Sequence, residues 1–293
     1  MTKLNLFIKK TLLFAVFNFF LTFPFHSVSK YNFNVEKSVS NTFSGQKINQ
    51  NINDSVLVIV IDPGHGGKDA GTGYDGIYEK NVVLDISKAL KGKIEAALPG
   101  SKVVLTREND IFVPLHSRIR VANAMNADLF LSLHCNSFVE DSNVNGSEVH
   151  VLGLGNDPDK LNTALRENAS ILFESDHEKN YDWHDPDSPE AHIFLSAFQN
   201  IFLDESICLA LKISKSNQIK PILKQRGVKQ SGLLVLRNAA MPALLIETGY
   251  LSNINDRNIM NQPFGQNQIA SWIANVLMEH FIFDKRGLVM NKS

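Results

Sequence analysis

The sequence is poor in cysteine, has no excess of charge of either sign, and carries no internal repeat. Its 293 residues include 29 basic and 30 acidic residues, which gives a formal net charge of −1. This balance lacks the basic excess typical of proteins that bind nucleic acid, so we expect no nucleic-acid partner. The two cysteines, Cys135 and Cys208, permit one disulfide without requiring it, because each lies in an apolar pattern that suits a buried thiol.

The sequence also lacks an apolar run long enough to span a membrane. The longest such stretch, residues 11–25, is about 15 residues, whereas a spanning helix needs about 20. Three lysines precede it, and the small residues Ser27 and Ser29 suit a cleavage site, so residues 1–29 are predicted to be a secretory signal peptide. We therefore expect an exported protein of the periplasm or cell-wall space, with no stable membrane anchor after cleavage. The mature chain would carry 26 basic and 30 acidic residues.

The rest of the chain is predicted to form one domain. Residues 30–54 are rich in polar side chains without helical or strand periodicity and are interpreted as a flexible leader. Residues 55–283 alternate apolar strands with amphipathic helices, and residues 284–293 form a tail. Strands are expected at 56–61, 102–106, 128–133, 148–152, 232–236 and 243–246, and helices at 80–98, 115–125, 190–216 and 268–281. This alternation predicts an α/β fold, a doubly wound sheet with helices on both faces.

Polar side chains stand where these predicted elements meet. His65, His134 and Glu247 each follow an apolar strand, and Glu79 stands at the start of the first helix. Open α/β sheets bind ligands at the carboxyl ends of their strands, and two imidazoles with one carboxylate form the ligand set of a catalytic zinc. Taken singly, a histidine after a strand is more often structural. Glu79 alone would be a helix N-terminal carboxylate favoured by the macrodipole.

The glycine-rich loop around His65 superficially resembles a phosphate-binding loop. Such a loop needs Ser or Thr after its lysine to hold magnesium, whereas Asp69 follows Lys68 here. An acidic side chain beside phosphates would repel them, so this reading is rejected.

Five blocks, taken together, closely resemble the zinc-dependent N-acetylmuramoyl-L-alanine amidases of type 3 that trim bacterial peptidoglycan. They are DPGHGGKDAG (62–71), YEK (78–80), LTR (105–107), LSLHCN (131–136) and LIETGYLSN (245–253). The resemblance implies a mixed, mostly parallel six-stranded sheet with helices on both faces. It implies one Zn²⁺ per chain held by His65, Glu79 and His134, with Glu247 as the catalytic glutamate. Cys135 departs from the small residue common after the third ligand, and we favour a packing role for it.

The reaction implied by the resemblance is hydrolysis of the amide between N-acetylmuramic acid and L-alanine in peptidoglycan. Lys68, Arg107 and Asn136 are possible contacts to the peptide stem, although solvated loop residues are an equally good interpretation. Two other functions stay open: a zinc carboxypeptidase, which uses the same ligand chemistry, and a non-catalytic protein that binds the cell wall.

The segment 153–189 is longer than a connection between a strand and a helix needs. Its amphipathic stretch from Leu161 to Leu172 predicts a helix, and Glu167 and Glu174 lie seven residues apart in or just after it. Some relatives in the resembled family carry a helical insertion here that covers the zinc until an activator protein displaces it. We hypothesise a regulatory, self-inhibitory lid with Glu167 or Glu174 as the blocking ligand. The alternative is a surface excursion with solvated acidic residues.

Overall fold

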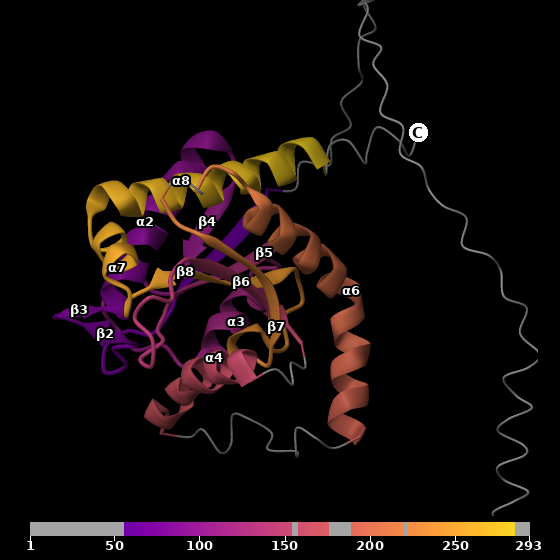
Figure 1. Ribbon diagram of the computed structural model, residues 1–293. Coiled ribbons are helices and arrows are strands. Elements are labelled where there is room, and N and C mark those ends of the chain that lie inside the picture. Colours follow the sequence, from indigo (N-terminus) through magenta and orange to yellow (C-terminus); the bar gives the residue numbers. More distant parts are fainter. Residues whose placement is uncertain (1–55, 154–157, 176–188, 220–221, 285–293) are drawn as a thin grey trace, which may run out of the picture. The chain divides into compact units, whose positions relative to one another are not determined.

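The computed structural model describes residues 56–153, 158–175, 189–219 and 222–284 (Figure 1). The predicted signal peptide and leader therefore lie outside the described residues. Six strands form one sheet in the order β4-β1-β5-β8-β6-β7. Their bounds are β1 Val58–Pro63, β4 Lys102–Leu105, β5 Leu129–Asn136, β6 Ser147–Leu152, β7 Gln225–Ser231 and β8 Ala243–Tyr250. All neighbours pair in parallel except β8 with β6, so the predicted mixed, mostly parallel six-stranded sheet is confirmed.

The two central strands β5 and β8 are buried along their whole length. Their apolar runs have no exposed face because helices cover both sides of the sheet, the usual environment of parallel strands. One face packs on α2 (Glu79–Ala97), α6 (Pro189–Lys215) and α8 (Pro263–Glu279). The other packs on α3 (Leu115–Ala124) and α4 (Pro158–Asn168) (Figure 1).

Side chains alternate between these two faces along each strand. On β8, Leu244 and Ile246 join the core beneath α2 and α8, whereas Leu245 joins the core beneath α3. Glu247 therefore points to the α3 and α4 face, two positions beyond Leu245. The same alternation on β5 places His134 on that face, four positions beyond Phe130.

Shorter elements complete the described chain. A hairpin of β2 (Gly73–Tyr74) and β3 (Ile77–Tyr78) precedes α2. The 3-10 turns η1 (Ala169–Phe173) and η2 (Leu234–Leu236), the helix α7 (Ile254–Met260) and the π-turn η3 (His280–Asp284) make up the rest. Among the described residues, every helix is too short or too polar to cross a membrane.

One predicted strand was wrong. The apolar run over residues 232–236 forms the 3-10 turn η2, and the sixth strand is the preceding, polar segment β7. β7 pairs with β6 alone and forms an edge of the sheet, so most of its side chains are only half buried. An edge strand needs no apolar run, whereas Val235 and Leu236 are buried in the core beside α3.

Candidate metal centre

The centre lies where β1 and β5 end. Gly64 continues β1, and its amide donates to the Leu133 carbonyl of β5. His65 follows with φ 57°, a left-handed conformation that turns its side chain back over the strand ends. A Cβ on Gly64 would lie 2.4–2.8 Å from the His134 ring, so glycine is needed for the two histidines to approach each other. The ring centroids are 4.9 Å apart.

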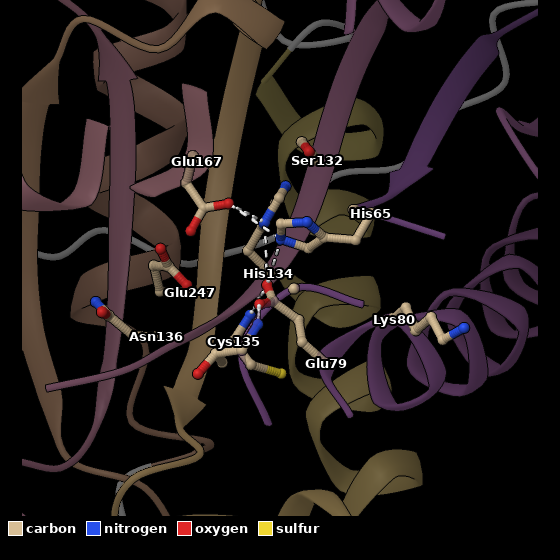
Figure 2. A network of polar contacts seen from close by, with 12 residues as sticks. His65, Glu79, Lys80, Ser132, His134, Cys135, Asn136, Glu167 and Glu247 are labelled. Carbon is tan, nitrogen blue, oxygen red and sulfur yellow. Dashed lines mark hydrogen bonds and ion pairs between the residues drawn. The ribbon is translucent and has the colours of Figure 1, made fainter. Parts of the chain in front are cut away.

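Four side chains converge there from four parts of the chain (Figure 2). Glu79 Oε1, at the first residue of α2, lies 3.2 Å from His65 Nε2 and 3.1 Å from His134 Nδ1. Glu167 Oε2, from α4, lies 3.2 Å from His65 Nε2 and 2.7 Å from His134 Nδ1. One ligand atom from each of the four lies within 4.8 Å of the others. All four residues are buried.

A second set of groups fixes the orientation of these side chains. Asp69 Oδ2 lies 2.9 Å from His65 Nδ1, so the opposite nitrogen, Nε2, faces the centre. The two oxygens of Glu79 accept hydrogen bonds from the backbone amides of Thr72 and Cys135, each at 2.9 Å. Carboxylates and backbone groups of this kind typically hold metal-ligating side chains in place.

The donor set fits a divalent metal ion with tetrahedral geometry. With metal–ligand distances near 2.0–2.1 Å, neighbouring ligands of a tetrahedral zinc lie roughly 3.3 Å apart, close to the separations of 2.7–3.2 Å here. His65 Nε2 and Glu167 Oε2 are buried without a hydrogen-bond partner. Buried polar atoms are rarely left unpaired, and a shared cation would satisfy both.

The charges at the centre lead to the same conclusion. Burial lowers the pKa of the His134 imidazole, but the carboxylates of Glu167 and Glu79 outweigh burial and raise that pKa to about 9. Burial also disfavours a charged His65, yet Glu79, Asp69 and Glu167 raise its pKa well above the ordinary value. Three carboxylates thus face two imidazoles, an environment that strongly favours a cation between them.

Glu247 lies beside this centre rather than in it. It pairs in register with His134 on the neighbouring strand β5 and is completely buried. Burial raises the pKa of its carboxyl group to about 8. The negative charges of Glu167 and Glu79 also raise this pKa, whereas the positive charge of Arg166 lowers it. Its Oε2 has no hydrogen-bond partner, and its Oε1 accepts from Arg166 at 3.0 Å. A buried carboxyl group of this kind is well suited to accept and return a proton.

Two consecutive residues of α4 reach different parts of the site. Glu167 enters the metal centre, and Arg166 contacts both the Glu247 carboxylate and Asn136 Oδ1. The Arg166 guanidinium also donates to the Ser137 carbonyl and to Glu167 Oε1, which joins the two side chains into one unit. α4 therefore covers the centre and its neighbouring carboxylate together.

The turn η1 after α4 holds this helix in place over the metal centre. Ser170 donates to Asp69 Oδ2, the same oxygen that contacts His65. Asn168 exchanges hydrogen bonds with the loop that follows β7. Glu174 does not reach the metal centre, because its Oε1 accepts from the Leu115 amide at the start of α3. Of the two glutamates predicted as blocking ligands, only Glu167 lies at the centre.

The three predicted substrate contacts lie in three different environments. Asn136 is buried beside Glu247, within the network of Arg166. Lys68 is exposed and stacks its ammonium over the Phe112 ring. Arg107 is buried, and its guanidinium donates to the carbonyls of Pro63, Gly64, Lys80 and Asn109. Arg107 thus supports the backbone of the His65 loop and does not face the site.

Sequence reasoning missed Arg166, Asp69 and Ser170. Adjacent helical residues point about 100° apart, so a blocking Glu167 gave no reason to place Arg166 at the same site. Asp69 of the His65 loop and Ser170 of η1 are far apart in the sequence and come into contact only in the folded chain. The sequence holds no local pattern for either contact.

The cysteines are both free. Cys135 is buried, with its sulfur 3.5 Å from Thr248 Oγ1 and 3.8 Å from Met260 Sδ, whereas Cys208 is exposed on α6. Cys135 is not among the four converging residues. It fills a gap between β5 and α7 as a packing residue.

Comparison with known proteins identifies the family to which this chain belongs. The family model for N-acetylmuramoyl-L-alanine amidase matches residues 59–279. N-acetylmuramoyl-L-alanine amidase AmiA of Salmonella typhimurium is 30% identical over 230 residues, which cover 78% of this chain and 77% of that protein. AmiC of Escherichia coli O6:H1 is 31% identical over 255 residues, and the match covers 84% of this chain but 58% of that relative's length.

A solved structure agrees with these sequence matches. N-acetylmuramoyl-L-alanine amidase AmiC2 of Nostoc punctiforme superposes with a TM-score of 0.56 at 30% identity and covers 77% of this chain and 97% of its own. The family model spans both predicted histidine ligands, Glu79 and Glu247. The chain therefore belongs to the N-acetylmuramoyl-L-alanine amidase family.

Proposed function

We propose that the protein is a zinc-dependent peptidoglycan amidase that hydrolyses the amide between N-acetylmuramic acid and L-alanine. Family membership supports the reaction class. The observation that carries the metal dependence is the convergence of His65 Nε2, His134 Nδ1, Glu79 Oε1 and Glu167 Oε2 within 4.8 Å. His65, Glu79 and His134 would hold the ion permanently. Asp69 accepts a hydrogen bond from His65 Nδ1, and two backbone amides donate to Glu79, so these two side chains are held in place.

The chain's own residues have distinct roles in this proposal. A bound zinc ion lowers the pKa of its water and polarises the scissile carbonyl. Glu247 accepts the proton of the attacking water and returns it to the departing amine of L-alanine. Its burial next to β5 keeps the carboxylate close to His134 and away from bulk solvent. Asn136, at the same edge of the sheet, would donate to a carbonyl of the peptide.

The proposal includes control by α4. With a metal ion bound, Glu167 would be a fourth protein ligand in place of the attacking water, so we interpret the described conformation as a closed state. We assign residues 55–283 to the catalytic domain and 153–189 to a regulatory insertion, and we expect an activator protein to displace α4. Peptidoglycan as substrate places the working enzyme outside the cytoplasmic membrane, in agreement with the signal peptide predicted for residues 1–29.

The test combines metal analysis with product analysis. Purified mature protein should contain about one zinc per chain, and its Glu167→Ala variant, which lacks the blocking glutamate, should release from sacculi peptides that begin with L-alanine. His65→Ala, Glu79→Ala and His134→Ala should each reduce zinc content and abolish release. Release of single terminal amino acids would instead indicate a carboxypeptidase. Full zinc content and binding to sacculi without any released peptide, in the Glu167→Ala variant, would indicate a wall-binding protein and would contradict the proposal.

A further inference from the structure

A cluster of buried and half-buried charges lies next to Glu247 on the side away from the metal centre. Glu148 of β6 pairs in register with Glu247 of β8, so both side chains lie on the same face of the sheet. Glu148 is completely buried. Two cations of the edge strand β7 contact it, Arg226 Nε at 2.5 Å and Lys229 Nζ at 3.0 Å.

Neutral groups hold this cluster in place. The Tyr250 hydroxyl donates to Glu148 Oε1 at 2.8 Å, and the Arg226 guanidinium stacks over the Tyr250 ring. His150 Nε2 lies 3.3 Å from Glu148 Oε2, and its other nitrogen lies 2.9 Å from Ser231 Oγ. Burial lowers the pKa of His150, so this imidazole is neutral near pH 7. The charged members are therefore Glu148, Arg226 and Lys229.

The two cations reach the surface, whereas their carboxylate does not. The side chains of Arg226 and Lys229 are 27% and 19% exposed, against 0% for Glu148. A buried ion pair is a weak source of stability, because apolar residues of similar volume serve as well or better. What Glu148 achieves is geometric: it fixes two long, flexible cationic side chains at one point beside the site.

Hydrogen bonds connect Glu148 and its two cations to the groups around Glu247. Asn136 Nδ2 lies 3.5 Å from Glu148 Oε2, and Asn136 Oδ1 accepts from Arg166, which also contacts Glu247. Two strand spacings, roughly 10 Å, separate β8 from β7. An extended peptide advances about 3.3 Å per residue, so the cations lie two or three residues from an amide at Glu247.

We propose that Arg226 and Lys229, held by Glu148, form a subsite that binds a carboxylate of the peptide stem. This inference rests on the proposed amidase function. In the substrate, the carboxyl group of the lactyl moiety is part of the scissile amide, so the free carboxylates near the reaction belong to the peptide. The stem then runs from β8 across β6 to β7, and the glycan lies on the opposite side, toward β1.

The test pairs two changes, one in the protein and one in the substrate. The substrates are synthetic N-acetylmuramoyl tripeptides in which the carboxylate of the second or of the third residue is either free or a carboxamide. The proteins are the mature chain and its Lys229→Met and Lys229→Arg variants, each also made with Glu167→Ala. Lys102→Met is the matched control, because Lys102 is an exposed lysine on β4, the opposite edge of the sheet.

We expect the parent chain to prefer one free carboxylate over its carboxamide by at least about 10-fold in kcat/KM, the usual effect of one charged hydrogen bond. Lys229→Met should reduce this preference by raising KM for the free acid alone, because only Arg226 of the two cations remains, whereas Lys229→Arg and Lys102→Met should keep the preference in full. The position at which the carboxamide lowers kcat/KM identifies the stem residue whose carboxylate binds the subsite. Zinc content and thermal unfolding confirm that each variant is folded, and Glu148 keeps Arg226 as a partner in Lys229→Met.

Two results would overturn the inference, and they are distinguishable. If the parent hydrolyses acid and carboxamide equally, or if Lys229→Met keeps the preference undiminished, the subsite is absent while the amidase function stands. If no chain hydrolyses any of these substrates or sacculi, the amidase function fails and the subsite fails with it.

Discussion

Arg166 and Glu247 form an ion pair of 3.0 Å between the covering helix α4 and the strand β8. The neighbouring Glu167 enters the metal centre, where its Oε2 lies 2.7 Å from His134 Nδ1. One turn of α4 thus contacts both the metal centre, where the attacking water would bind, and the carboxylate proposed to accept the proton of that water. The closed state would be inhibited at two points, and displacement of one helix would release both.

The first prediction separates these two points. Arg166→Ala and Glu167→Ala should each raise basal hydrolysis of sacculi above the parent level, and the double variant should exceed both, because each removes one of the two contacts. The measurement is the rate of peptide release at equal zinc occupancy. Arg120→Ala, which changes an exposed arginine of α3, should leave the rate unchanged. Parent-level activity in the double variant would rule out inhibition by α4.

The second prediction separates metal binding from proton transfer. Glu247→Gln keeps the shape of the side chain but removes the proton acceptor. Because Glu247 is not among the four converging residues, zinc content should stay near one per chain. Peptide release should fall by at least about 10²-fold, in the usual range for a general base. Turnover at the parent rate would assign the base to another residue.

The third prediction contrasts two basic residues that the sequence suggested for the same role. Arg107→Met leaves the Gly64 carbonyl without its donor, whereas the Pro63 carbonyl keeps the hydrogen bond from Arg118. An unsatisfied buried group costs about 1–3 kcal/mol, so we expect the free energy of unfolding to fall by about that amount and zinc affinity to fall with it. Lys68→Met should change neither quantity, because Lys68 is exposed.

Urea unfolding of the two variants, with zinc present and after chelation, measures both effects. A contact between Arg107 and substrate would appear instead as an increase in KM with unchanged stability. That outcome would contradict the supporting role that the hydrogen bonds indicate.

The strand ends were predictable from the sequence because burial leaves a strong local pattern. β1, β5 and β8 contain apolar runs that are followed closely by His65, His134 and Glu247, and such runs are typical of the central strands of a parallel sheet. Glu79 could be placed because the helix after it has a clear apolar period. The central strands and the polar residues after them therefore followed from the order of residues, whereas the mixed six-stranded sheet and the roles of these polar residues were implied by the resemblance to the amidase family.

The outer parts of the fold were not predictable in this way. β7 consists mostly of polar residues because it lies at an edge, and its half-buried cations resemble in sequence those of any solvated segment. The contact between Arg166 and Glu247 joins residues 81 positions apart and depends on how α4 docks. Such contacts are determined by tertiary packing, for which a single sequence carries no periodic signal.

The last prediction tests the close approach of the two histidines. In Gly64→Ala the new Cβ would meet three atoms of the His134 ring at 2.4–2.8 Å, so the ring must move. That ring is held between Glu79 and Glu167, and a displaced imidazole no longer matches the other ligands. We expect zinc affinity to fall at least about 10-fold, since disturbing even the supports of a metal ligand typically costs 10–100-fold. Gly92→Ala is the matched control, because a Cβ there meets nothing within 4 Å and alanine is the better residue within α2. Competition with a chromogenic chelator measures zinc affinity in both variants, and unchanged affinity in Gly64→Ala would show that His134 is not a ligand in the position described.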